Sequence, residues 1–227
     1  MLVAKIVYII VLSYLIGSIP FGLLISKFGA KKDIRKFGSG KIGATNVLRT
    51  AGSKAAIIAL VADVLKGMLP VILAGYLFGD NLLVIGSFGV GTLLVQVAAA
   101  LASVAGHNWS IFLKFKGGRG VATYFGGLTA LCPPAAIIGT ETLFISAGLT
   151  RYVSFGSILG VVISYIVLLP LTIVYKFPLE YMGYALVGSV VILVMHKDNI
   201  NRLITGTERK LGEKAEGRLS ASSETGV

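Results

Sequence analysis

The chain has 227 residues, of which 55% are apolar and only 14% are charged, and its mean hydropathy is +0.86. Soluble domains carry about 25% charged residues, so this composition excludes an ordinary soluble protein and indicates a polytopic membrane protein. The net charge of +11 does not indicate a nucleic-acid partner, because no RNA- or DNA-binding pattern is present. Since no linker-like segment divides the chain, we expect one transmembrane domain over residues 1–206 and a charged cytoplasmic tail over residues 207–227.

Hydropathy predicts an all-α bundle of about seven membrane-spanning segments. In chain order these cover residues 3–28, 54–78, 81–105, 119–132, 135–150, 153–175 and 179–195. The first lacks a basic n-region and a small-residue cleavage site, so we interpret it as a span rather than a signal peptide. The fourth and fifth are short against the ~20 residues that cross the hydrocarbon. They are expected to be tilted, half-length or one hairpin broken at Pro133 and Pro134; five or six crossings are the alternatives.

The cations are distributed unevenly between the connections. All but three of the 21 Lys and Arg residues fall on one side of the predicted spans. The exceptions are Lys5 and Lys176 on the other side and Lys66 within the second span. Cytoplasmic connections of membrane proteins are enriched in Lys and Arg, so we expect the N-terminus outside and the C-terminus inside. This alternation requires an odd number of crossings and places three polar segments on the cytoplasmic side.

The first polar segment, residues 38–46, is rich in glycine and hydrogen-bonding side chains. Ser39, Thr45 and Asn46 are able to donate to phosphate oxygens, and Lys41 and Arg49 supply positive charge. Its glycines are Gly38, Gly40 and Gly43. Their Gly-x-Gly-x-x-Gly spacing does not indicate a dinucleotide site, because no strand precedes it. We interpret the segment as an anion site; a flexible loop with ordinary turn residues is the alternative.

The second polar segment follows His107 and contains a basic, glycine-rich loop at residues 114–120. Its glycines, Gly117, Gly118 and Gly120, are expected to bring backbone N–H groups close to an anion. Lys116 and Arg119 bracket the glycine pair and would neutralise a phosphate. The loop is not a Walker A motif, because Gly-Lys-Ser/Thr is missing. The alternatives are a loop whose cations only set topology and, for His107, an interfacial cap.

The third polar segment contains His196 and Asn199, whose i, i+3 spacing puts them on one helical face. A polar helix end leading into the tail is the alternative. Within the second span, Asp63 and Lys66 share a face, which favours a structural ion pair or a pocket wall over a catalytic dyad. One cysteine and two histidines do not suit a zinc site, so we expect no metal.

In combination these motifs resemble the bacterial acyl-phosphate:glycerol-3-phosphate acyltransferase family, small integral-membrane enzymes that begin phospholipid synthesis. The resemblance extends over nearly the whole chain, to residues 201–206. Two departures from the family pattern are Lys41, where asparagine is expected, and Arg119, where lysine is common. The matching residues are 17–22, 38–40, 43–46, 63–67, 106–107, 115–123, 196 and 199–203.

The resemblance implies a seven-span bundle in the bacterial cytoplasmic membrane, without a cofactor and with its site on the cytoplasmic side. The expected reaction moves a fatty acyl group from acyl phosphate to the 1-hydroxyl of glycerol 3-phosphate, giving lysophosphatidic acid and phosphate. By analogy, Ser39, His196, Asn199 and Lys116 would act in the catalytic centre, Lys116 holding phosphate together with the glycine loop. A membrane transporter of an organic phosphate and a non-enzymatic lipid-binding protein are the alternatives.

Overall fold

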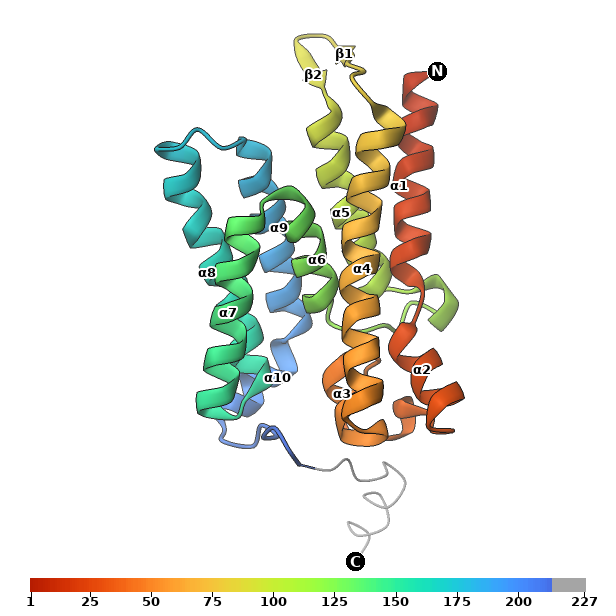
Figure 1. Cartoon of the computed structure of the whole chain (residues 1–227), viewed down its shortest axis with the longest axis vertical. Helices are drawn as coiled ribbons and strands as arrows, with labels where there is room; N and C mark the ends of the chain where they lie inside the picture. Colours follow the sequence, from red (N-terminus) through yellow and green to blue (C-terminus); the bar gives the residue numbers. More distant parts are fainter. Residues whose placement is uncertain (214–227) are drawn as a thin grey trace, which may run out of the picture.

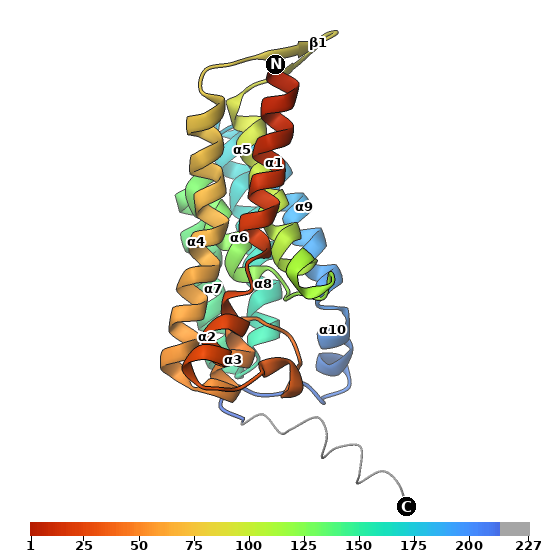
Figure 2. The same ribbon diagram turned by 90° about the vertical axis from the view of Figure 1, so that its right-hand side faces the viewer.

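The computed structural model describes residues 1–213 as one bundle of helices that run side by side (Figure 1). A two-stranded hairpin lies at one end of the bundle, near the N-terminus, and the short helices α2, α3 and α10 lie at the other end (Figures 1 and 2). The longer helices are α1 (Leu2–Ser18), α4 (Ser53–Phe78), α5 (Thr92–Asn108), α6 (Val121–Leu131), α7 (Pro133–Thr150), α8 (Val153–Ile173) and α9 (Leu179–Met195). The shorter ones are α2 (Phe21–Gly29), α3 (Ala44–Ala51), α10 (Lys197–Ile204) and the 3₁₀ helices η1 (Ile34–Lys36) and η2 (Ile111–Leu113).

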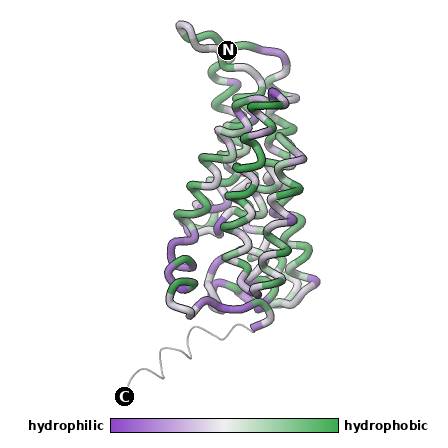
Figure 3. Tube along the Cα trace, turned by 90° about the vertical axis from the view of Figure 1, so that its left-hand side faces the viewer, coloured by the Kyte–Doolittle hydropathy of each residue, from purple (hydrophilic) through white to green (hydrophobic). Residues whose placement is uncertain are grey.

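Three stretches of residues 1–213 are long and apolar enough to cross a membrane, namely Leu2–Gly29, Ser53–Phe78 and Val153–Ile173. A fourth is added if α9 and α10, which meet at a bend of 62°, are taken as one span. The tube coloured by hydropathy is green along the helices and purple mainly at the end that carries α3 and α10 (Figure 3). The chain is therefore a multi-pass membrane protein whose polar residues gather at one end.

The predicted first span is helical but broken. Helix α1 ends at Ser18, and Pro20, which lacks an N–H donor, is the N-cap of α2. The prediction for residues 81–105 is wrong in its first half. Residues 83–90 form the antiparallel hairpin of β1 (Leu83–Ile85) and β2 (Phe88–Val90), and α5 begins only at Thr92. Hydropathy does not separate a short apolar strand from a helix, and Gly86, with φ 62°, makes the tight turn.

Helices α6 and α7 form the short hairpin that was one of the predicted alternatives. Helix α6 has only 11 residues, and the chain reverses at Cys132, after which Pro133 occupies the first turn of α7. Helix α6 lies very close to α4, because Gly67 faces the backbone of Thr123 and Gly126 faces the carbonyl of Val64. Glycine is required at both contacts, since a Cβ atom at either position would overlap the facing carbonyl oxygen.

Candidate active site

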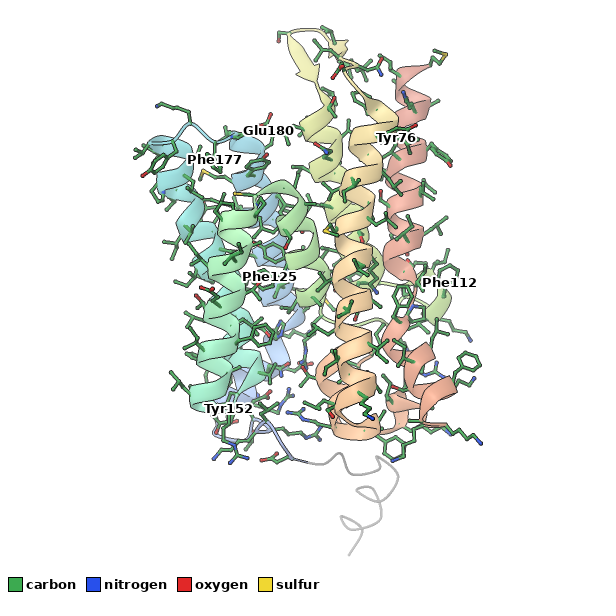
Figure 4. All side chains as sticks on the ribbon, viewed as in Figure 1. Tyr76, Phe112, Phe125, Tyr152, Phe177 and Glu180 are labelled. Carbon is green, nitrogen blue, oxygen red and sulfur yellow. The ribbon has the colours of Figure 1, made fainter. Side chains whose placement is uncertain are left out.

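A cavity of about 590 Å³ lies at the end of the bundle that carries α3 and α10. One part of its wall is apolar and comes from α4, α6 and α7; it includes Leu60, Phe125 and Phe144, and Figure 4 shows Phe125 between these helices. The other part is polar, and its members come from segments distant in the sequence. These polar members are Ser39, Lys41, Thr45, Asn46, Arg49, Ser53, Asp63, His107, Arg119, Ser154, Ser157, His196 and Glu208.

The first polar segment is held in place by Asn46. Its buried side-chain amide donates to the carbonyls of Ile34 at 2.9 Å and Lys41 at 2.9 Å. Its Oδ1 accepts from the N–H of Ser39 at 3.3 Å. Asn46 therefore fixes the loop, and Ser39 Oγ is left facing the cavity with an accepted hydrogen bond from the N–H of Lys41. The Ser39 hydroxyl is therefore able to donate a hydrogen bond to a ligand in the cavity.

The predicted residues of this segment do not all reach the cavity. Gly43 and Thr45 line it together with Ser39, Lys41 and Arg49. Gly38 and Gly40 do not line it, and they take the left-handed conformation with φ 52° and 69°. Their place in the loop is explained by the turns they make, because such φ values are strained for other residues.

Two arginines bring positive charge into the cavity. Arg49, on α3, and Arg119, just before α6, both line it, and the buried Nε atom of each has no hydrogen-bond partner in residues 1–213. Burial and the nearby arginines lower the pKa of Arg119 to about 10, so it stays protonated at neutral pH. Burial also lowers the pKa of Arg49. Two half-buried arginines, each with a buried Nε donor that has no partner in the described residues, are suited to binding an anion.

The glycine loop differs from its predicted role. The N–H groups of Gly117 and Gly118 donate to the carbonyls of Asn108 at 3.1 Å and His107 at 3.0 Å, which belong to the last turn of α5. These two N–H groups are thus occupied, and the prediction that they approach an anion is wrong. Gly118 packs so closely on the His107 ring that a Cβ atom there would overlap Nε2. The glycines dock the loop onto α5, and this docking places Arg119 and Gly120 at the cavity.

Lys116 lies outside the cavity. Its side chain is exposed to the surroundings, and it does not line the cavity wall. Arg119, three residues later, is the cation of this loop that reaches the cavity. The sequence pattern did not separate the two, because both flank the same glycine pair and differ only in which side of the docked loop they occupy.

His196 is held at the bend between α9 and α10. Its Nδ1 atom lies 2.8 Å from the carbonyl oxygen of Ile192, so Nδ1 carries the proton and Nε2 is the acceptor nitrogen of the neutral ring. Burial, together with the positive charge of Arg119, lowers the pKa of His196 to about 4. His196 is therefore neutral at physiological pH. It offers the cavity a hydrogen-bond acceptor and is a weak base.

Asn199 and an acidic residue of the tail are joined beside this histidine. Asn199 does not line the cavity; its side-chain amide donates to Glu208 Oε1 at 2.7 Å, while its buried Oδ1 has no partner among the described residues. Ser154 Oγ donates to the same Glu208 oxygen at 2.9 Å, and Arg202 Nε donates to the other at 2.7 Å. Burial opposes ionisation of Glu208, but these three hydrogen bonds outweigh it and lower its pKa.

The protein-family model of glycerol-3-phosphate acyltransferases matches residues 7–206 of the chain. The chain belongs to this family. Glycerol-3-phosphate acyltransferase 3 of Dehalococcoides mccartyi (strain CBDB1) is 57% identical, with 95% of this chain and 100% of the relative aligned. Glycerol-3-phosphate acyltransferase of Thermus thermophilus is 42% identical, over 93% of this chain and 98% of the relative.

Two crystal structures of the integral membrane glycerol 3-phosphate acyltransferase PlsY (YgiH) are similar to this fold. The glycerol 3-phosphate form superposes with a TM-score of 0.77 at 34% identity, covering 96% of this chain and 98% of that chain. The lysophosphatidic acid form gives a TM-score of 0.76 at 33% identity, with the same coverage.

In this member of the glycerol-3-phosphate acyltransferase family, Glu208 lines the cavity, and sequence reasoning did not predict this. The tail after Gly206 is charged and had no assigned role, yet Glu208 and Leu211 line the cavity. The available signal was an acidic residue that interrupts a strongly basic segment. Asp63 and Lys66 form the predicted ion pair, with Lys66 Nζ 2.8 Å from Asp63 Oδ1. Asp63 is also part of the cavity wall, which was the other predicted alternative.

Proposed function

We propose that the protein transfers a fatty acyl group from acyl phosphate to the 1-hydroxyl of glycerol 3-phosphate, releasing lysophosphatidic acid and inorganic phosphate. The observation that carries this proposal is a single cavity that joins two buried, unpaired arginine Nε atoms to an apolar groove. Both substrates carry a phosphate, and the donor also carries an acyl chain. The related structures with glycerol 3-phosphate and with lysophosphatidic acid are consistent with these substrates.

The phosphate of glycerol 3-phosphate is assigned to Arg49 and Arg119, with the Ser39 hydroxyl as a further donor. Arg49 and Arg119 come from different elements, and both line the cavity. Positive charge from two directions and donors in a buried site favour a phosphate dianion over a neutral ligand. The departure of Arg119 from the lysine common in the family preserves this charge.

Reaction chemistry follows from the weak basicity of His196. Its Nε2 atom accepts a hydrogen bond from the attacking 1-hydroxyl and orients that oxygen toward the acyl carbonyl carbon. As the new ester C–O bond forms, the carbonyl C–O bond to phosphate breaks, and an oxygen of the leaving phosphate takes the hydroxyl proton. A histidine with a pKa of about 4 suits this orienting role better than full proton abstraction. Asn199 positions the site by holding Glu208.

The acyl chain is assigned to the apolar groove between α4, α6 and α7. The groove wall includes Leu60, Phe125, Leu143 and Phe144. Each CH₂ group that leaves water for such a groove is stabilised by about 0.8 kcal/mol, so the groove favours a long acyl chain over a short one. Because the groove and the polar part belong to one cavity, we assign the acyl carbonyl to the region beside Ser39 and His196.

For the membrane arrangement, we propose seven crossings, with the N-terminus outside, the C-terminus inside and the site on the cytoplasmic side of a bacterial inner membrane. The crossings are α1, α4, α5, α6, α7, α8 and α9. Two observations support this topology: all but three of the 21 Lys and Arg residues fall on one side of the predicted spans, and the hydrophilic residues of the described chain gather mainly at the end that carries α3 and α10 (Figure 3). We retain a catalytic domain over residues 1–206, completed by contacts from the first residues of the tail 207–227.

The deciding experiment incubates the purified protein with glycerol 3-phosphate and either palmitoyl phosphate or palmitoyl-CoA. Release of phosphate and formation of lysophosphatidic acid are followed in parallel. Product from palmitoyl phosphate alone supports the proposal and its donor. Product from palmitoyl-CoA alone refutes the donor, and no product from either in a folded preparation refutes the acyltransferase function and makes transport of an organic phosphate the next hypothesis to test.

A further inference from the structure

The segment from Trp109 to Lys116, which we call the finger, has no role in the proposed reaction. It connects α5 to the glycine loop, contains η2, and projects sideways from the bundle beside the joint of α1 and α2 (Figures 1 and 4). Lys114 and Lys116 are exposed on it and do not line the cavity. The two lysines that sequence analysis placed in a phosphate loop thus face away from the site.

The finger also exposes large apolar side chains. Phe112 and Phe115 have relative exposures of 58% and 60%, and Trp109 has 42%. Figure 4 shows Phe112 pointing outward on the flank of the bundle. Exposed apolar patches mark sites of interaction with protein or membrane, and aromatic residues are enriched where a membrane protein meets the interface between lipid and water.

The backbone of the finger is fixed. Ser110 Oγ donates to the carbonyl of Ser18 at 2.6 Å, and Tyr14 Oη donates to the carbonyl of Trp109 at 2.7 Å, so the finger is attached to the last turn of α1. Lys114 and Phe115 both take left-handed φ values, 52° and 61°, which are costly for residues with side chains. The N–H of Phe115 donates to the carbonyl of Ser110 at 2.8 Å and stabilises this turn. The cations and the aromatic rings are therefore presented together.

The charge on the finger is of one sign. No Asp or Glu occurs anywhere in residues 81–140, so no carboxylate neighbour in the sequence neutralises Lys114 or Lys116. The attachment to α1 at Ser18 puts the finger where this apolar helix ends. Under the proposed topology that level is the cytoplasmic interface, where anionic headgroups lie directly above acyl chains.

We propose that the finger binds anionic phospholipid: Trp109, Phe112 and Phe115 insert among the acyl chains, and Lys114 and Lys116 pair with negatively charged headgroups. The binding is with membrane lipid, separate from the substrate cavity. A lysine near an anionic surface gains ~1 kcal/mol, which corresponds to about fivefold enrichment of anionic lipid per lysine.

The test uses Trp109, which is the single tryptophan of the chain. The full-length protein is reconstituted in phosphatidylcholine vesicles that contain the same small fraction of either brominated phosphatidylglycerol or brominated phosphatidylcholine. Bromine quenches tryptophan fluorescence only at short range. We expect several-fold stronger quenching by brominated phosphatidylglycerol, and a smaller difference at high salt because ions screen the attraction.

Two double variants test whether the finger lysines, rather than the overall positive charge at this end of the bundle, attract the anionic lipid. K114Q/K116Q is expected to bring the quenching by the two brominated lipids to the same level, while K54Q/K197Q, which removes two other exposed lysines, keeps the difference. Equal quenching by both lipids in the unmodified protein overturns the proposal, and this comparison does not depend on any variant folding. Absence of quenching by either lipid, or an equal effect of both double variants, also overturns it. The quenching measurement does not depend on acyltransferase activity, so a failure of the lipid-binding proposal is distinguishable from a failure of the proposed reaction.

Discussion

Replacing Arg119 with glutamine tests whether the cavity binds phosphate through Arg49 and Arg119. The change keeps a polar side chain of similar reach but removes the charge and the guanidinium donors. Arg119 is half-buried, its buried Nε atom has no partner within residues 1–213, and it lines the cavity with Arg49. The glycerol 3-phosphate headgroup is distant from the bond that changes, so the arginine should bind substrate and transition state about equally.

The size of the effect follows from the type of contact that is lost. Hydrogen bonds to charged groups contribute about 1.5–3 kcal/mol, which corresponds to about 10- to 150-fold in affinity. We therefore expect R119Q to raise KM for glycerol 3-phosphate by about this factor, with kcat nearly unchanged, as uniform binding requires. KM for palmitoyl phosphate should change less if the donor phosphate lies nearer to Ser39 and His196.

The assay measures initial rates of phosphate release against glycerol 3-phosphate concentration at saturating palmitoyl phosphate. Folding is checked through the melting temperature reported by a thiol-reactive dye, because Cys132 is the single cysteine and is buried. The matched control is R35Q, which removes an exposed arginine paired with Asp33. A folded R119Q protein whose KM stays within twofold of the unmodified value, or which loses kcat alone, would refute the reasoning.

Three further predictions concern the groove, the histidine and the helix contact. Phe144 lies between the groove and a neighbouring cavity of about 300 Å³. F144A should therefore raise kcat/KM for longer acyl phosphates, by about fourfold for each added CH₂ group that the enlarged groove accommodates, whereas I145A should not. Measuring kcat/KM for a series of acyl phosphates of increasing chain length tests this. The pKa of His196 is about 4 in the folded protein and about 6.5 in the unfolded chain. Between these values the unfolded chain binds more protons than the folded protein, so lowering the pH through this window destabilises the fold. At pH 5 the loss of unfolding free energy is ~2 kcal/mol. The melting temperature of the unmodified protein should fall more between pH 7 and pH 5 than that of H196Q, and equal falls would contradict the pKa. G126A should destabilise the protein by about 1–3 kcal/mol because its Cβ overlaps the carbonyl of Val64, whereas G183A, where a Cβ meets open space, should leave the melting temperature unchanged or higher.

Much of the fold was predictable because long apolar runs leave few alternatives in a membrane. The second span, predicted at residues 54–78, is α4 at Ser53–Phe78, and the last, predicted at 179–195, coincides with α9. The hairpin at residues 83–90 was not predicted, because its residues are as apolar as a helix and the difference lies in the turn at Gly86. Hydropathy indicates whether a segment lies in an apolar environment, but it does not give the backbone conformation, which in this hairpin depends on the glycine at the turn.

The site was predictable in composition but less so in detail. Residue type identified Ser39, Arg49, Arg119 and His196, all of which line the cavity. The glycine loop was misinterpreted because two opposite uses of glycine, approach to an anion and approach to another helix, leave the same pattern in the sequence. Glu208 was missed because its partners lie on other helices, and no spacing within the tail reports a contact with Ser154.

The contacts of Glu208 with Asn199 and of Arg49 with the tail have a consequence for biogenesis. Arg49 Nη2 donates to the carbonyls of Arg209 at 3.1 Å and Lys210 at 3.3 Å, so segments about 160 residues apart in the sequence meet beside the cavity. A nascent chain that enters the membrane from its N-terminus cannot close this site until the segment around residue 208 has left the ribosome. A chain that ends before residue 208 would contain every predicted span and still lack the contacts of Glu208 with Ser154 and Asn199, so its cavity wall would be incomplete.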